Sequence, residues 1–167
     1  QWIEGAVALN VSRQDLVESA RYFSLLRGAL VRRLRMSNAL YLTFGGCIAS
    51  QWQVALACFA AAAEALLTCE TGRGVTARLA SAYASLLSPT SDSRDQLFLE
   101  FRELYRNRSD VMHGRGHLIA PAERLPILAR FGDALRAVLR TVLDSADYTH
   151  ALEGDDDQRR AFFRALQ

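Results

Sequence analysis

Apolar residues recur at intervals of three and four in long runs of this chain, and this spacing most constrains its fold. Such spacing gathers the apolar side chains on one side of an α-helix. The first run contains Leu16, Ala20, Phe23, Leu26, Leu30 and Leu34. Similar runs follow at 97–105 and 125–142. Alanine and leucine are abundant, while three prolines and ten glycines are few among 167 residues. The sequence therefore predicts an all-α protein.

Capping residues and helix breakers indicate where the helices begin and end. Three pairs have the spacing of an N-terminal capping box: Ser12 with Asp15, Ser50 with Gln53, and Ser93 with Gln96. Gly45 and Gly46 are expected to break or kink a helix over 37–47. Gly114 is expected to cap the helix of the second run, and Pro121 to begin the last long helix.

The length of the chain fits one domain. We expect a helical domain over 12–150, preceded by a linker or N-terminal arm over 1–11. Residues 151–167 begin with an acidic run and form either a tail or a short helix. Because the chain begins at Gln1 rather than Met, we expect it to be excised from a longer protein or processed.

Composition narrows the classes of function. The net charge of +2 is too small to indicate nucleic-acid binding by itself. Cys47, Cys58 and Cys69 lie in apolar sequence without the close spacing of a zinc site. We expect free, mostly buried thiols, as in the reducing cytoplasm, and neither metal nor cofactor. No apolar run is long enough to cross a membrane, so we expect no membrane association.

Residues 104–114, Leu-Tyr-Arg-Asn-Arg-Ser-Asp-Val-Met-His-Gly, hold the clearest candidate site. Arginine is a permanent cation whose forked donors suit phosphate, and histidine exchanges protons near neutral pH. Phosphodiester cleavage needs both, so Arg108 and His113 are the candidate catalytic pair. The candidate supporting residues are Tyr105, Arg106, Asn107, Ser109 and Asp110.

The spacing of this segment leaves two questions open: which arginine would bind the phosphate, and whether these residues form a site or only stabilise the helix. On an ideal helix Arg108 and His113 lie about 140° apart, whereas Arg106 and His113 lie about 20° apart. Either arginine is therefore a candidate phosphate ligand, and a helix end that unwinds near Gly114 would bring Arg108 to His113. Alternatively, the histidine only complements the helix dipole and the charges pair along the helix.

A longer set of residues resembles the Apea-like branch of the HEPN superfamily. The set comprises Thr76-Ala77-Arg78-Leu79-Ala80, Leu86-Leu87, Ser93-Arg94-Asp95, Phe101, Leu104-Tyr105, Arg108-Ser109 and Val111-Met112-His113-Gly114. The resemblance covers about 49–143, and its last ten residues are the specific part. Two positions depart from the pattern: Ser109 stands where many nucleases of the superfamily carry Asn, Asp or His, and Arg115 replaces the tyrosine of toxins silenced by nucleotide transfer.

The resemblance implies an HEPN-like helical bundle of about five main helices with a short C-terminal helix, usually paired as a homodimer. It implies a metal-independent endoribonuclease in which two motifs meet across the dimer. His113 would act as general base or acid at the ribose 2′-hydroxyl or leaving oxygen. Arg108 would hold the scissile phosphate, with Arg106 as the alternative, and the product would be a 2′,3′-cyclic phosphate. Ser109 and Asp110 would be positioning residues.

The resemblance also implies a biological setting. We expect a cytoplasmic effector domain of a prokaryotic antiviral defence or toxin system, acting on RNA. A further domain before Gln1, or a partner sensor protein, would control it. The alternatives are a non-catalytic HEPN module that dimerises or binds RNA or nucleotide, and an unrelated helical scaffold.

Overall fold

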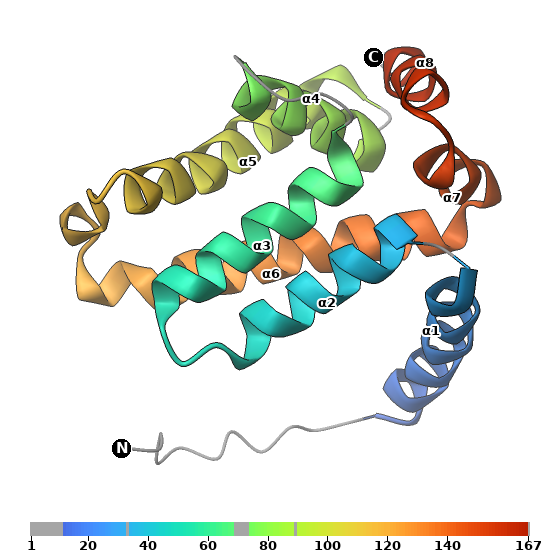
Figure 1. The fold of residues 1–167 in the computed structure, drawn as a ribbon, viewed down its shortest axis with the longest axis horizontal. Coiled ribbons are helices and arrows are strands. Elements are labelled where there is room, and N and C mark those ends of the chain that lie inside the picture. Colours follow the sequence, from blue (N-terminus) through green and yellow to red (C-terminus); the bar gives the residue numbers. More distant parts are fainter. Residues whose placement is uncertain (1–11, 33, 69–73, 89, 167) are drawn as a thin grey trace.

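The chain is all-α, as the sequence predicts, in a computed structural model that describes residues 12–32, 34–68, 74–88 and 90–166. These residues form eight α-helices and one short 3-10 helix, and include no strand (Figure 1). The elements are α1 (Arg13–Arg32), α2 (Leu34–Ile48), α3 (Trp52–Leu67), α4 (Val75–Leu87), α5 (Ser91–Met112), η1 (Gly116–Leu118), α6 (Pro121–Asp144), α7 (Ala146–Glu153) and α8 (Asp156–Ala165).

The core lies between α3, α4, α5 and α6. Its aromatic rings form a chain of contacts in which Phe59 of α3 stacks on Phe131 of α6, with centroids 6.2 Å apart. Phe131 meets Phe101 of α5 at 5.7 Å, and Phe101 stacks on Tyr83 of α4 at 4.4 Å. Aromatic pairs in this range add about 0.5–1.5 kcal/mol beyond area burial. The rings therefore fix α5 against α3 and α6.

Helices α2 and α3 form a hairpin and lie side by side in Figure 1. The predicted break at Gly45 and Gly46 is wrong, because α2 continues through both glycines to Ile48. A Cβ on Gly46 would overlap the Phe59 ring and lie 3.1 Å from the Ala55 carbonyl oxygen. Gly46 therefore serves the close approach of two helices rather than a bend.

Two of the predicted capping boxes are also wrong. Helix α3 begins after Gln51 and α5 after Thr90, and neither start has a side-chain cap. The hydroxyl of Ser93 instead hydrogen-bonds with the hydroxyls of Ser88 and Thr90. The spacing predicted that Ser93 caps a helix, but its side chain is instead hydrogen-bonded within the α4–α5 connection.

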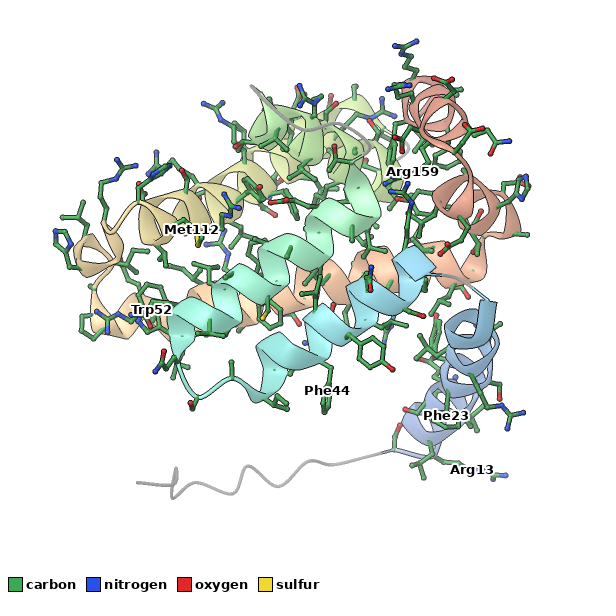
Figure 2. The ribbon with its side chains drawn as sticks, in the orientation of Figure 1. Arg13, Phe23, Phe44, Trp52, Met112 and Arg159 are labelled. Carbon is green, nitrogen blue, oxygen red and sulfur yellow. The ribbon has the colours of Figure 1, made fainter. Side chains whose placement is uncertain are left out.

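The first predicted helix is divided between α1 and α2, with Leu34 already in α2. Its apolar stripe is only partly covered, since Leu16 is exposed. Phe23 is exposed as well (Figure 2). Polar contacts fasten α1 to the end of α6. The Asp144 carboxylate accepts hydrogen bonds from Arg21 at 2.5 Å and Tyr22 at 3.0 Å.

The segment after residue 150 contains the end of α7 and the whole of α8. Asp155 and Gln158 form a capping box at the start of α8. The buried Arg159 side chain donates to the carbonyl oxygens of Ala65 and Thr68 at the end of α3. Of the two alternatives for this segment, the structure contains the short helix.

The cysteines differ from the expectation of mostly buried thiols. Cys47 is exposed, because it lies on the outer side of α2, and Cys58 is half-buried. Cys69 and the expected arm over 1–11 lie outside the described residues.

Candidate functional site

A Schellman motif ends α5 and fixes the backbone around the candidate histidine. Gly114 adopts a φ of +75°, and its N–H donates to the carbonyl oxygen of Val111 over 3.0 Å. The N–H of Arg115 donates to the carbonyl oxygen of Asp110 over 2.7 Å. This pair of bonds is typical of a helix that ends with a left-handed glycine. The predicted cap at Gly114 is confirmed, and His113 is the residue before it.

A side-chain ion pair reinforces the same turn. Nε and Nη2 of Arg115 donate to Oδ1 of Asp110 over 3.0 and 2.8 Å. This ion pair joins Asp110 and Arg115, the same two residues that the backbone hydrogen bond joins. Asp110 therefore holds the turn that carries His113, rather than orienting the guanidinium of Arg108.

Arg108 turns toward α3. Its Nη2 lies 3.6 Å from Oε1 of Glu64, and its guanidinium carbon lies 5.6 Å from the centre of the Tyr105 ring. Both charged side chains keep about a third of their surface exposed, at 34% for Arg108 and 35% for Glu64. The guanidinium is thus held against α3 while part of it stays open to a ligand.

Tyr105 of α5 is the third member of this cluster, beside Glu64 and Arg108. Its hydroxyl donates to Oε1 of Glu64, the oxygen that also faces Arg108. Burial raises the pKa of the Tyr105 phenol, and the hydrogen bond to Glu64 raises it further. The phenol therefore remains a donor to Glu64, whose same oxygen also pairs with the charge of Arg108.

Helix α5 is regular through Met112, so it does not unwind between the arginines and His113. The ideal-helix angles therefore hold to a first approximation: Arg106 is about 20° from His113, and Arg108 about 140°. Within the described part of the chain, no hydrogen bond or ion pair joins His113 to either arginine. Arg106 and His113 are both exposed. Of the two alternatives, the regular helix is the one observed, and the unwinding that would bring Arg108 to His113 inside one chain does not occur.

The other candidate residues lie close to Arg108 along the helix. Asn107 and Ser109 are half-buried on α5. Beyond the turn, Nδ1 of His117 lies 3.2 Å from the carbonyl oxygen of Gly114. These groups surround the turn with polar atoms, and the side chain of His113 remains in solvent.

Glu64 belongs to this cluster and is not among the residues predicted from the sequence. It is the one charged residue of α3, among alanines and leucines. A charged side chain on a largely buried helix needs a polar partner, because burying it unpaired is costly. The position of a single glutamate in an apolar helix therefore indicates that Glu64 has a polar partner. The sequence does not indicate that the partners are Tyr105 and Arg108.

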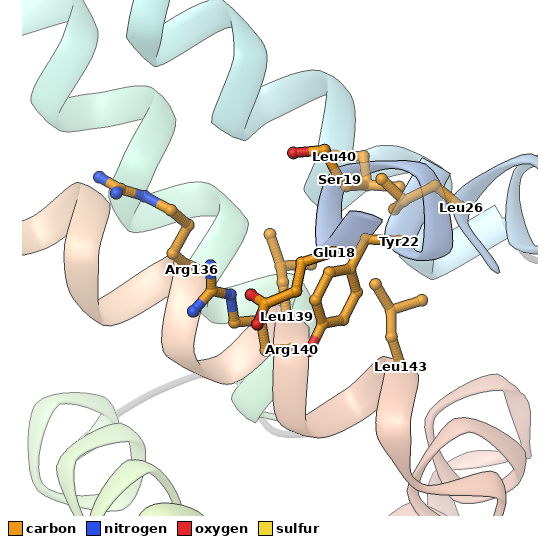
Figure 3. Close-up of a pocket in the computed structure, with 9 residues that line it drawn as sticks. All are labelled: Glu18, Ser19, Tyr22, Leu26, Leu40, Arg136, Leu139, Arg140 and Leu143. Carbon is orange, nitrogen blue, oxygen red and sulfur yellow. The ribbon is translucent and has the colours of Figure 1, made fainter. Parts of the chain in front are cut away.

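A cavity lies away from this site, between α1, α2 and α6 (Figure 3). Its volume is about 270 Å³. The lining residues are Glu18, Ser19, Tyr22, Leu26, Leu40, Arg136, Leu139, Arg140 and Leu143. None of the candidate catalytic or supporting residues is among them.

No protein-family model, curated protein or solved structure matches this chain. Among the described helices, none has the length and apolar character needed to cross a membrane. The described residues also include no group of three or more His, Cys, Asp and Glu side chains placed to hold a metal ion. The function must therefore be inferred from the α5 site and from the resemblance of its sequence.

Proposed function

We propose that this chain is an HEPN-type endoribonuclease that cleaves RNA by attack of the ribose 2′-hydroxyl. The observation that carries the proposal is the arrangement at the end of α5. His113 stands exposed in a turn fixed by Gly114, and the Arg115–Asp110 pair braces that turn. One turn earlier, Glu64 holds a partly open Arg108. An exposed proton-transfer group and a held cation suit phosphodiester cleavage.

The mechanism assigns one role to each side chain. His113 takes the proton from the 2′-hydroxyl or gives one to the leaving oxygen. Arg108 binds the scissile phosphate, and its forked donors stabilise the charge that develops on it. The attack leaves a 2′,3′-cyclic phosphate, and the proposal invokes no metal ion or cofactor.

A second copy of the chain supplies the missing juxtaposition. In one chain Arg108 faces α3, and a regular helix separates it from His113 by about 140°. Two α5 ends that meet across a two-fold axis would bring Arg108 of each copy toward the His113 of the other. Arg106, which lies on the His113 side of α5, is the alternative phosphate ligand.

By the same resemblance, the chain would be the effector part of a prokaryotic defence or toxin system. Its helices would form an HEPN-like bundle. A further domain or a partner protein would sense the signal that triggers cleavage. The second candidate function is a non-catalytic HEPN module for dimerisation or RNA binding. The Glu64–Arg108 ion pair favours that alternative, because it partly neutralises the cation that a phosphate would need.

Cleavage of labelled single-stranded RNA in EDTA tests the proposal. The wild-type chain is expected to produce 2′,3′-cyclic phosphate ends. His113→Ala and Arg108→Ala are each expected to lower the rate by about 100-fold or more. His150→Ala, which removes another exposed histidine on α7, is the matched control and should cleave at the wild-type rate.

Circular dichroism should show that every variant keeps its helical content. Cleavage that survives in His113→Ala would contradict the assigned mechanism. A chain that binds RNA but never cleaves it would favour the non-catalytic alternative.

A further inference from the structure

Helix α1 packs against α2 and α6 beside the cavity of Figure 3, which the proposed cleavage does not use. The cavity has a volume of about 270 Å³, just below the range of about 300–1,000 Å³ that is usual for drug-sized ligands. Leucine side chains from all three helices line it, namely Leu26, Leu40, Leu139 and Leu143. It therefore offers an apolar wall and room for a small molecule.

Polar contacts hold Tyr22 of α1 in the wall of this cavity. The Tyr22 hydroxyl donates to Oδ2 of Asp144 over 3.0 Å, and Nη2 of Arg21 pairs with Oδ1 of the same carboxylate over 2.5 Å. These contacts join α1 to α6 through side chains of the chain itself. The cavity is therefore pre-formed, as small-molecule sites usually are.

Arg140 of α6 brings a positive charge to the cavity. Its guanidinium carbon lies 5.7 Å from the centre of the Tyr22 ring. Within the described ranges of the chain, no carboxylate forms an ion pair with Arg140. The other arginine of the lining, Arg136, pairs with Asp133 at 2.7 Å. Arg140 thus has the guanidinium that can bind the carboxylate of a ligand, which its forked donors suit.

Glu18 of α1 brings a negative charge to the same cavity. Its Oε1 accepts a hydrogen bond from Nε2 of Gln14 over 3.2 Å. In the part of the chain that the structure describes, it forms no ion pair. A carboxylate attracts an ammonium group and repels an organic anion, and an arginine does the opposite. A ligand that carries both charges therefore fits the lining better than a simple anion or a simple amine.

We propose that this cavity binds a free amino acid with an apolar side chain. Glu18 receives its ammonium group, Arg140 receives its carboxylate, and its side chain lies against the leucines. A fatty acid would leave Glu18 facing a like charge, and an alkyl amine would do the same to Arg140. Apolar walls with a few polar groups that fix orientation are typical of small-molecule sites.

This inference is independent of the proposed function. None of the residues assigned to RNA cleavage lines the cavity. Failure to bind an amino acid would therefore leave the ribonuclease proposal standing, and failure to cleave RNA would leave this one standing.

Isothermal titration calorimetry of the whole chain tests which groups of the ligand are recognised. The probe is leucine, beside isocaproate, which lacks the ammonium group, and isoamylamine, which lacks the carboxylate. Leucine is expected to bind about 10-fold or more tightly than either analogue, the effect of one hydrogen-bonded charge. Glycine, which lacks the apolar side chain, is expected to bind about 10-fold or more weakly than leucine.

Two substitutions test the residues that bind the charges. Glu18→Gln and Arg140→Gln are each expected to raise the dissociation constant for leucine about 10-fold. Glu18→Gln should not weaken the binding of isocaproate, and Arg140→Gln should not weaken that of isoamylamine. Each analogue lacks the group that the altered residue binds, so a variant that had merely misfolded would lose both.

Arg130→Gln is the matched control. This arginine also lies on α6, 4.0 Å from Glu103, and does not line the cavity. The control should bind leucine as the wild-type chain does. Circular dichroism should show unchanged helicity in all three variants.

Leucine that neither releases heat nor raises the unfolding temperature at millimolar concentration would overturn the inference. So would an analogue that binds the wild-type chain as tightly as leucine, because the cavity would then recognise only one charge. Leucine binding that Arg140→Gln leaves unchanged would place the ligand elsewhere on the chain and would overturn it too.

Discussion

Glu64 determines how Arg108 is presented. One carboxylate oxygen accepts the Tyr105 hydroxyl and faces the guanidinium of Arg108. Partly exposed ion pairs contribute little to stability, commonly about 0–1 kcal/mol. The Glu64–Arg108 pair therefore acts mainly by orienting the guanidinium, since it limits the directions that the long arginine side chain can take. Tyr105 is nearly fully buried and makes the larger contribution to stability.

Tyr105→Phe is expected to lower the free energy of unfolding at neutral pH by about 1.5–3 kcal/mol, because it removes a hydrogen bond to a charged acceptor. Urea unfolding followed by circular dichroism measures this loss. Tyr41→Phe is the matched control, because that tyrosine is exposed on α2. Its effect should stay within about 0.5 kcal/mol. Equal losses in the two variants would contradict the role of the Glu64 contact.

The same tyrosine gives a dependence on alkaline pH. Burial and the Glu64 hydrogen bond raise the pKa of Tyr105 above its ordinary value of 10.0. The unfolded chain therefore releases this proton first, so stability present below pH 10.0 is lost as the pH rises above it. Tyr105→Phe should show a shallower loss between neutral and alkaline pH. A wild-type slope in the variant would show that other groups cause the loss.

At the scale of the helices, the contact between α2 and α3 depends on Gly46. A side chain there would overlap the Phe59 ring, and Phe59 itself stacks on Phe131 in the core. The neighbouring Gly45 differs, because a Cβ there would meet only the Cys58 sulfur at an ordinary 3.7 Å. The two adjacent glycines thus form a matched pair for a packing test.

Gly46→Ala is expected to destabilise the fold by about 1–3 kcal/mol through overpacking. Gly45→Ala is expected to be neutral or to stabilise by up to about 1 kcal/mol, because alanine is the better helix former. Thermal and urea unfolding of the two variants measure both effects. Stabilisation by Gly46→Ala would contradict the close approach of the two helices.

These glycines also illustrate what the sequence could predict about the elements. Gly114 and Pro121 act locally, through backbone conformation, and the helix ends predicted from them are correct. Gly46 acts through a contact with another helix, and no local pattern distinguishes that role from a break. The capping patterns at Ser50 and Ser93 were wrong for a similar reason, since polar spacing does not reveal which residue the packed helix starts from.

At the scale of the whole molecule, the candidate site was predictable as a list of residues but not as an arrangement. Arg108 and His113 belong to one short segment, and their chemistry is evident from their types. Glu64 reaches Arg108 only because α3 packs against α5. Residues 36–63 contain no charged side chain and resemble ordinary core sequence, yet the fold exposes Tyr41, Phe44 and Ile48.

The central claim is that Arg108 of one copy and His113 of the other form one ribonuclease site. Mixing Arg108→Ala with His113→Ala after allowing the subunits to exchange tests it most directly. Each variant alone should be inactive, whereas a mixed dimer retains one site with both residues intact. Because half of the dimers are then mixed and each has one working site, cleavage should recover to about a quarter of the wild-type rate. A mixture that stays inactive, beside a wild-type chain that cleaves RNA, would contradict a site shared between two copies.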